Sequence, residues 1–126
     1  MTQSAQQIMT TAAVAARFNE LAKEEKWFEI QEELFADNVK SIEPENSPYL
    51  KNEEGKAAVR KKGQDFVARI EGANRLHTSE AIVAASHFAV SREMDITVQG
   101  HGRIVINQIM LYEVKDGQIV AEQFFY

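Results

Sequence analysis

Apolar and polar residues alternate along much of the last third of the chain, from Leu76 to Tyr126. A period of two residues is typical of strands that bury one face. The final turn is centred on Asp116-Gly117, a dipeptide that accepts the positive φ angles of a two-residue hairpin turn. We therefore predict an antiparallel meander whose last hairpin has a defined register.

The first half of the chain carries a helical period instead. Apolar residues that recur every three or four positions predict three helices, over residues 4–25, 27–36 and 54–70. A short strand is expected over residues 39–43, because Pro44 cannot continue a strand ladder. Residues 44–52 hold both prolines and are predicted to form a loop. Helices followed by strands indicate one α+β domain over residues 1–126, with the helices on one face of the sheet.

Cross-strand partners share a face of a sheet, so the turns decide which side chains lie together. Turns at residues 85–86, 99–102 and 116–117 would give one mostly apolar face, face one, whose polar members are His77, Arg92, Asn107, Glu122 and Tyr126. Under a layer of helices, such a face forms an apolar pocket with a few converging polar groups. A slip by one residue in either of the first two turns would exchange the faces of those strands.

The opposite face of the predicted sheet, face two, is apolar on its last two strands. It carries Ile106, Met110, Tyr112, Ile119 and Phe125. In a monomer these side chains would form a large exposed apolar patch. We therefore predict a homodimer that forms through this face.

Composition narrows the function classes. The formal net charge of −5, with no basic run among aromatic residues, argues against a nucleic-acid partner. The chain has no cysteine, which excludes disulfides and thiolate chemistry. It has no apolar stretch near the roughly 20 residues of a membrane span, and its first residues lack the pattern of a signal peptide. A membrane partner is therefore not expected, and a cytoplasmic location is the default expectation.

Three segments carry a resemblance to a known family. They are Val-Lys-Ser-Ile-Glu-Pro at 39–44, Gly-Lys-Ala-Ala-Val at 55–59 and the ending Tyr-Glu-Val-Lys-Asp-Gly-Gln-Ile-Val-Ala-Glu-Gln-Phe-Phe-Tyr at 112–126. With this order of elements, the chain resembles the nuclear transport factor 2-like superfamily and, within it, the SnoaL-like domains. The resemblance implies a cone-shaped α+β fold with helices on a curved mixed or antiparallel sheet, an internal pocket and, commonly, a homodimer.

The resemblance implies less about activity, because the fold hosts isomerases, cyclases, dehydratases, hydrolases and non-catalytic binding domains. In related ketosteroid isomerases, positions like those of Glu122, Phe124 and Tyr126 line the pocket. Cyclases and isomerases of this type use a carboxylate in the pocket, often with a histidine or a tyrosine.

One predicted row of face one joins His77, Asn107 and Tyr126. Imidazole moves protons near neutral pH, and an amide or a phenol can donate a hydrogen bond to an oxyanion. The alternative is a buried polar row whose members satisfy one another.

Glu122 falls in a predicted row of aliphatic residues. A carboxyl group in such surroundings has a raised pKa and is suited to general acid–base catalysis. The alternative is an ion pair with Arg92, which lies diagonally across the sheet, or with Lys62 of the third helix. Lys62 itself interrupts an apolar stripe, and it either reaches into the pocket to bind an anionic group or extends to water. Glu43 faces either Lys62 or solvent.

These observations predict a small-molecule pocket protein of the SnoaL-like type. In the catalytic version, His77 and Glu122 transfer protons on a mostly apolar carbonyl compound, Asn107 and Tyr126 orient an oxygen, and Lys62 and Arg92 hold charge. The predicted ligand-binding residues are Glu43, Lys62, Arg92, Asn107, Phe124 and Tyr126. No metal or other cofactor is expected, because the three histidines do not converge and no phosphate-binding or dinucleotide motif is present. The alternative is a non-catalytic ligand-binding or dimerisation module.

Overall fold

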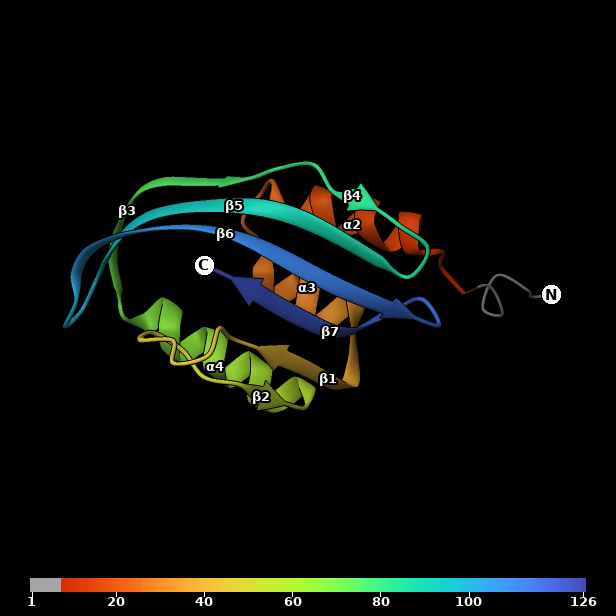
Figure 1. Ribbon diagram of the computed structural model, residues 1–126, viewed down its shortest axis with the longest axis horizontal. Coiled ribbons are helices and arrows are strands. Elements are labelled where there is room, and N and C mark those ends of the chain that lie inside the picture. The colour runs from red at the N-terminus through yellow and green to blue at the C-terminus, as the bar shows by residue number, and fades with distance from the viewer. Residues whose placement is uncertain (1–7) are drawn as a thin grey trace.

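A computed structural model describes residues 8–126. In this part of the chain, three helices pack on an open, mixed seven-stranded sheet, which confirms the predicted α+β class. Figure 1 shows β5 (His87–Val98) and β6 (Gly102–Lys115) running along the length of the molecule. Helix α4 (Lys56–Ala68) lies at the side opposite β3 (Ile70–Thr78). The pocket described below lies between this curved sheet and the helices.

The first helix, α2, runs from Thr11 to Ala22. Its start is set by Thr10, whose side chain accepts a hydrogen bond from the Ala13 N–H group. The predicted start at Ser4 is wrong for residues 8–10, which are not helical, and residues 4–7 lie outside the described part of the chain. Within α2, Phe18 packs against the sheet.

The second helix, α3, covers Trp27–Leu34 and is followed at once by strand β1 (Phe35–Ile42). The helix is two residues shorter than predicted, and the strand begins four residues earlier. The third helix, α4, covers Lys56–Ala68 instead of the predicted residues 54–70. It begins later because Glu53 and Glu54 form the two-residue strand β2, which pairs with β1. The expected loop over residues 44–52 is confirmed.

The strand order in the sheet is β2-β1-β7-β6-β5-β3, with the short β4 (Ile82–Val83) paired to β5. Strand β7 (Gln118–Phe125) is parallel to β1 and antiparallel to β6. The last strand of the chain therefore lies in the middle of the sheet. Its side chains are placed between the first strand and the meander.

The β6–β7 hairpin turns at Asp116-Gly117, as predicted, and both residues have positive φ angles of 52° and 76°. Val114 pairs with Ile119, also as predicted. A bulge then shifts the register by one residue, so that Tyr112 pairs with residue 122 instead of 121. An added residue in one strand re-aims every side chain beyond it.

The predicted register of β5 with β6 is wrong by one residue. Val98 pairs with Gly102 instead of Arg103, because the connection uses three residues, and Gly100 and Gly102 both have positive φ. All of β6 is therefore turned over relative to the prediction. Its inward side chains are Ile104, Ile106, Gln108, Met110 and Tyr112, and its outward ones are Val105, Asn107, Ile109 and Leu111.

Strand β3 is also shifted by one residue. Leu76 pairs with Met94 and His77 with Glu93, whereas β4 has the predicted register, in which Val83 pairs with Phe88. Bulges in β3 and the break between β3 and β4 absorb the difference. His77 consequently lies on the outer face of the sheet and is exposed.

The predicted dimer face is wrong for four of its five residues. Ile106, Met110, Tyr112 and Ile119 are buried on the inner face, and only Phe125 is exposed. The core cluster includes Met110, Tyr112 and Ile119, with Tyr112 stacked on Phe88 at 5.0 Å between ring centroids.

The outer face carries a different apolar strip. Val105, Ile109 and Phe125 are 60%, 48% and 47% exposed, and Ile109 is the cross-strand partner of Phe125. None of the helices in the described part of the chain is long and apolar enough to cross a membrane.

Candidate functional site

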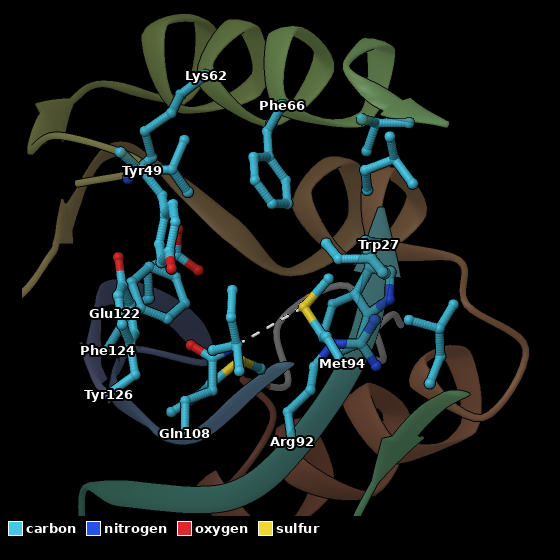
Figure 2. Close-up of a pocket in the computed structure, with 18 of the residues that line it drawn as sticks. Trp27, Tyr49, Lys62, Phe66, Arg92, Met94, Gln108, Glu122, Phe124 and Tyr126 are labelled. Carbon is cyan, nitrogen blue, oxygen red and sulfur yellow. Dashed lines mark hydrogen bonds between the residues drawn. The ribbon is translucent and has the colours of Figure 1, made fainter. Parts of the chain in front are cut away.

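A cavity of about 380 Å³ lies between the concave face of the sheet and helices α3 and α4. Most of its walls are apolar, and its charged groups gather at two ends. Figure 2 shows Lys62, Glu122 and Tyr126 on one side of this space and Arg92 with Trp27 on the other. The apolar residues between them include Phe66, Leu76, Met94, Ile96, Ile106, Met110 and Phe124.

Six of the eight predicted site residues line this cavity: Glu43, Lys62, Arg92, Glu122, Phe124 and Tyr126. The predicted placement of the other two is wrong. His77 and Asn107 lie on the outer face of the sheet, because β3 and β6 are each shifted by one residue from the predicted register. The imidazole and the amide therefore cannot reach a molecule in the cavity.

Glu122 reaches the cavity wall from the middle strand β7 and is buried. Its Oε2 atom accepts a hydrogen bond of 2.7 Å from the Ser41 hydroxyl, which in turn accepts one of 2.7 Å from Lys62 Nζ. Ser41 is the parallel-strand partner of Glu122 in the β1–β7 ladder. Strand pairing thus fixes the hydroxyl next to the carboxyl group.

Burial raises the pKa of the Glu122 carboxyl to about 7. The hydrogen bond from Ser41 and the positive charge of Lys62 oppose this rise, while the charge of Glu43 adds to it. Burial also raises the pKa of its cross-strand neighbour Tyr112 well above the ordinary value of a phenol. The phenol remains protonated at neutral pH, whereas both forms of the Glu122 carboxyl group are populated.

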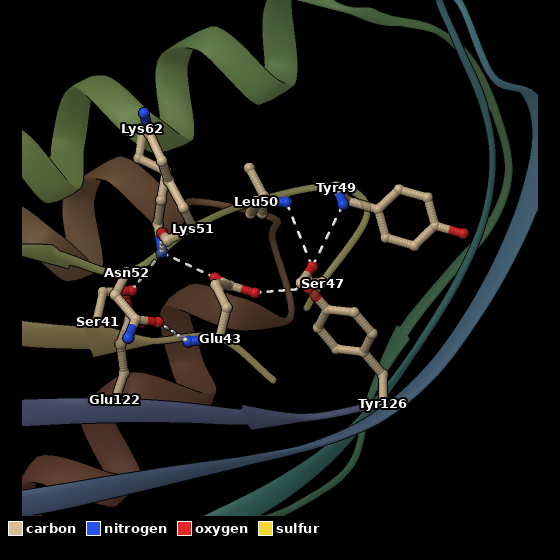
Figure 3. Close-up of polar contacts among 10 residues, drawn as sticks. All are labelled: Ser41, Glu43, Ser47, Tyr49, Leu50, Lys51, Asn52, Lys62, Glu122 and Tyr126. Carbon is tan, nitrogen blue, oxygen red and sulfur yellow. Dashed lines mark hydrogen bonds and ion pairs between the residues drawn. The ribbon is translucent and has the colours of Figure 1, made fainter. Parts of the chain in front are cut away.

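Lys62 lies in α4 and points down into the cavity end (Figure 3). Its three N–H groups donate to Ser41 Oγ, to Glu43 Oε2 at 2.8 Å and to the Lys51 carbonyl at 3.2 Å. In the Lys62–Glu43 pair, the glutamate side chain is buried and that of the lysine is 9% exposed. The lysine therefore does not extend to water, and its charge is held beside Glu122.

The loop over residues 44–52 is tied to the same end of the cavity. Tyr126 donates a hydrogen bond of 2.6 Å to Glu43 Oε1, and the Ser47 hydroxyl lies 2.6 Å from the Tyr126 oxygen (Figure 3). Partial burial and the bond to Glu43 raise the pKa of the Tyr126 phenol. Tyr49 of this loop lies 6.2 Å from Tyr126, measured between ring centroids, and also lines the cavity.

Arg92 forms the polar group at the other end of the cavity and is only 6% exposed at its side chain. Its guanidinium donates to both Glu25 oxygens, at 2.8 and 3.2 Å, and to Thr78 Oγ1 at 2.9 Å. It lies over the Trp27 ring, 4.5 Å from the centroid, and the indole N–H donates to Glu25 Oε1 at 2.8 Å. Of the alternatives considered for Glu122, the ion pair with Arg92 is therefore not formed, because Arg92 pairs with Glu25.

Sequence reasoning missed Gln108, which lies on the cavity floor between the two ends. Its amide makes one weak contact, from Nε2 to Met94 Sδ at 3.8 Å (Figure 2). It also missed Ser41, although a signal was present. Val39 and Ser41 of β1 and Glu43 directly after it occupy alternate positions and are all buried, so that the hydroxyl and the Glu43 carboxylate face the same side.

A family model for the SnoaL-like domain matches residues 9–126. A proposed SnoaL-like polyketide cyclase from Mesorhizobium loti is similar in both sequence and structure, with 31% identity and a TM-score of 0.87. The match covers 94% of this chain and 100% of that one. No curated protein sequence matches the chain.

More distant structures share the fold. An NTF2-like protein of unknown function from Burkholderia pseudomallei has a TM-score of 0.72 at 17% identity, over 94% of this chain and 92% of its own. A protein from Catenulispora acidiphila with a ketosteroid isomerase-like fold, in complex with trimethylamine, has a TM-score of 0.63 at 15% identity, over 77% and 72%. At these identities the likeness is one of fold.

Proposed function

Since the chain belongs to the SnoaL-like domain family of the nuclear transport factor 2-like superfamily, we propose that it binds a small, mostly apolar carbonyl compound in the cavity. Glu122 then acts on this compound as a general acid–base catalyst without a cofactor. The observation that carries this proposal is the position of Glu122. A buried carboxyl group with a pKa of about 7 opens onto a cavity whose walls are mostly apolar.

The reaction class is proton transfer next to a carbonyl group. Ionised Glu122 removes a proton from the carbon beside the carbonyl, and the electron pair of the broken C–H bond moves onto the carbonyl oxygen as an enolate. In a compound with a C=C bond next to that carbon, the C=O bond re-forms, the double bond moves into conjugation with it, and protonated Glu122 returns the proton to the far carbon of the original C=C bond, which gives an isomer. The Lys62 charge stabilises the negative charge that develops nearby, and the Gln108 amide is free to orient the oxygen.

The alternative is a non-catalytic binding module of the same fold. One observation favours it: hydrogen bonds link five of the polar residues to one another, namely Ser41, Glu43, Lys62, Glu122 and Tyr126. In that version, these groups give the end of the cavity its shape and polarity, and no proton is exchanged with the bound molecule.

The test begins with the ligand. Native mass spectrometry of the protein purified from its own host identifies the bound compound, which is then incubated with the wild type and with Glu122→Gln. The catalytic proposal expects conversion by the wild type and at least a hundredfold slower conversion by the variant, since general acid–base catalysis typically contributes 10²–10⁴-fold. Glu113→Gln, which removes a carboxylate from the outward side of β6, is the matched control. Binding without conversion by any of the three proteins would favour the module.

The homodimer expected from the family resemblance stays a prediction, and its place on the molecule changes. We propose that a second copy covers the outer strip of Val105, Ile109 and Phe125 through a two-fold contact. Large exposed side chains gathered on one side of the sheet, with Ile109 directly opposite Phe125, support this. The cytoplasmic location also stays a prediction.

A further inference from the structure

The Arg92 end of the cavity has the donors of an anion site. Two guanidinium N–H groups and the Trp27 indole N–H converge on one carboxylate, that of Glu25. A planar guanidinium that binds both oxygens of a carboxylate is the strongest such pairing that side chains offer. Thr78 holds the guanidinium from the other side, so the arginine is fixed in place whichever carboxylate it binds.

Glu25 occupies an unusual backbone position. Its φ angle is +57°, and it ends α2 in a turn where the N–H groups of Glu25 and Lys26 donate to the carbonyls of Ala22 and Leu21. Glycine is the usual residue at this point of such a turn, because other residues are strained there. Backbone strain of this kind is concentrated at functional sites. The strain is compatible with a role for the Glu25 carboxylate at Arg92.

Glu25 is also the movable member of the pair. Its side chain is 35% exposed, whereas that of Arg92 is 6% exposed. Together with Leu76 it separates the cavity from a second groove of about 470 Å³, which Lys23, Thr78 and Glu80 also line. The glutamate can therefore leave the arginine toward this groove and water, and the arginine cannot follow.

We infer that Arg92 and Trp27 form a carboxylate subsite of the cavity, and that Glu25 is an internal occupant which the carboxylate of a ligand replaces. This inference rests on the proposed function and names its substrate class. The ligand is an apolar carbonyl compound that carries a carboxylate. Its acid group binds Arg92, its apolar part contacts Leu76 and Met94, and its carbonyl end reaches Glu122.

The experiment compares two probes of equal chain length, octanoate and 1-octanol, in ¹H–¹⁵N NMR titrations. Trp27 is the only tryptophan of the chain, so its indole N–H signal reports directly on the subsite. Glu25→Gln removes the competing charge. It is expected to bind octanoate about tenfold more tightly than the wild type does, with a large shift of the indole signal. Its affinity for 1-octanol is expected to change by less than twofold.

Two further variants make the test specific. Glu80→Gln removes one negative charge from the neighbouring groove without touching Arg92, and it is expected to change octanoate affinity by less than twofold. Adding Arg92→Lys to Glu25→Gln keeps the positive charge but removes the two-pronged contact, and it is expected to abolish the gain. A urea unfolding curve of each variant shows that it is folded.

An equal gain of octanoate affinity in Glu80→Gln would overturn the subsite, because the effect would then be one of general charge. An equal gain for 1-octanol in Glu25→Gln would overturn it as well. If 1-octanol binds in the cavity and octanoate is never preferred, the subsite fails and the proposed function stands. If neither probe shifts any cavity signal in any variant, both the subsite and the proposed function fail.

Discussion

Tyr112 on β6 and Glu122 on β7 are direct cross-strand partners, and the bulge between Glu113 and Val114 makes them so. Without the bulge, residue 121 would pair with Tyr112 and Glu122 would turn away from the cavity. The same pairing places the buried carboxyl group beside a phenol. Burial raises the pKa of this carboxyl to about 7, and its hydrogen bond with Tyr112 opposes the rise. This relationship has a measurable consequence for stability.

The wild type is expected to lose stability between pH 4.5 and pH 8 relative to Glu122→Gln. The folded-state pKa of Glu122 lies above its ordinary value of 4.5. The folded protein therefore binds more protons than the unfolded chain in this interval, and unfolding becomes easier as the pH rises. The difference reaches on the order of a few kcal/mol above pH 7. Urea unfolding of both proteins across this range measures it, and parallel pH profiles would contradict the raised pKa.

Ser41→Ala is expected to raise the pKa of Glu122 further. The hydroxyl of Ser41 donates to the carboxylate and stabilises its charged form, so its removal favours the protonated form. The pKa is read from the side-chain carboxyl signal of ¹³C-labelled glutamate, assigned by its loss in Glu122→Gln. Ser91→Ala, on the outward side of β5, is the matched control and should leave the signal unchanged. A lower pKa in Ser41→Ala would show that the hydroxyl has another role.

Lys62→Met is expected to destabilise the fold by about 3–5 kcal/mol, because it leaves the buried Glu43 carboxylate without its partner. Adding Glu43→Gln should restore much of this loss, since the buried charge is then gone as well. The free energies of unfolding of the two single variants and the double variant form a cycle that measures the coupling. Additive losses in the double variant would mean that the two charges do not depend on each other.

The sequence predicts which side chains of one strand share a face better than it predicts how neighbouring strands are paired. Arg92 and Met94 lie inside the cavity as expected, because alternation along β5 requires no knowledge of a turn. The predicted face of β6 is wrong because residues 99–102 include two glycines. Such a stretch permits turns of different length, and the length of the turn sets which side chains of β6 point inward.

The sequence predicts the correct face for Glu122 through two errors that cancel. The slip between β5 and β6 turned β6 over, and the bulge before Val114 then shifted β7 by one residue in compensation. A bulge that depends on tertiary packing leaves no local signal in the sequence. The role of Glu25 had no signal either, since it depends on a turn that places this side chain beside Arg92.

Neighbouring residues on β6 test the register directly. Gln108 lines the cavity, and Asn107 faces outward and is exposed. Gln108→Ala is expected to weaken binding of the native ligand about threefold to tenfold through the loss of a hydrogen bond. Asn107→Ala is expected to change it by less than twofold. Equilibrium titration with the ligand identified by mass spectrometry measures both. If Asn107→Ala weakened binding more than Gln108→Ala did, the result would support the register predicted from the sequence instead.

Ile109→Lys is expected to convert a dimer into a monomer while the fold is retained. A charge in the middle of the outer strip, opposite Phe125, would have to be buried without a partner in a two-fold contact. Sedimentation velocity measures the molecular mass of the wild type and the variant at the same concentration. Thr97→Lys, opposite Arg103 and beyond the Val105 end of the apolar strip, is the control and should remain dimeric. A wild type that sediments as a monomer of 14.2 kDa would overturn the dimer. A dimer that survives Ile109→Lys would place the contact elsewhere on the molecule.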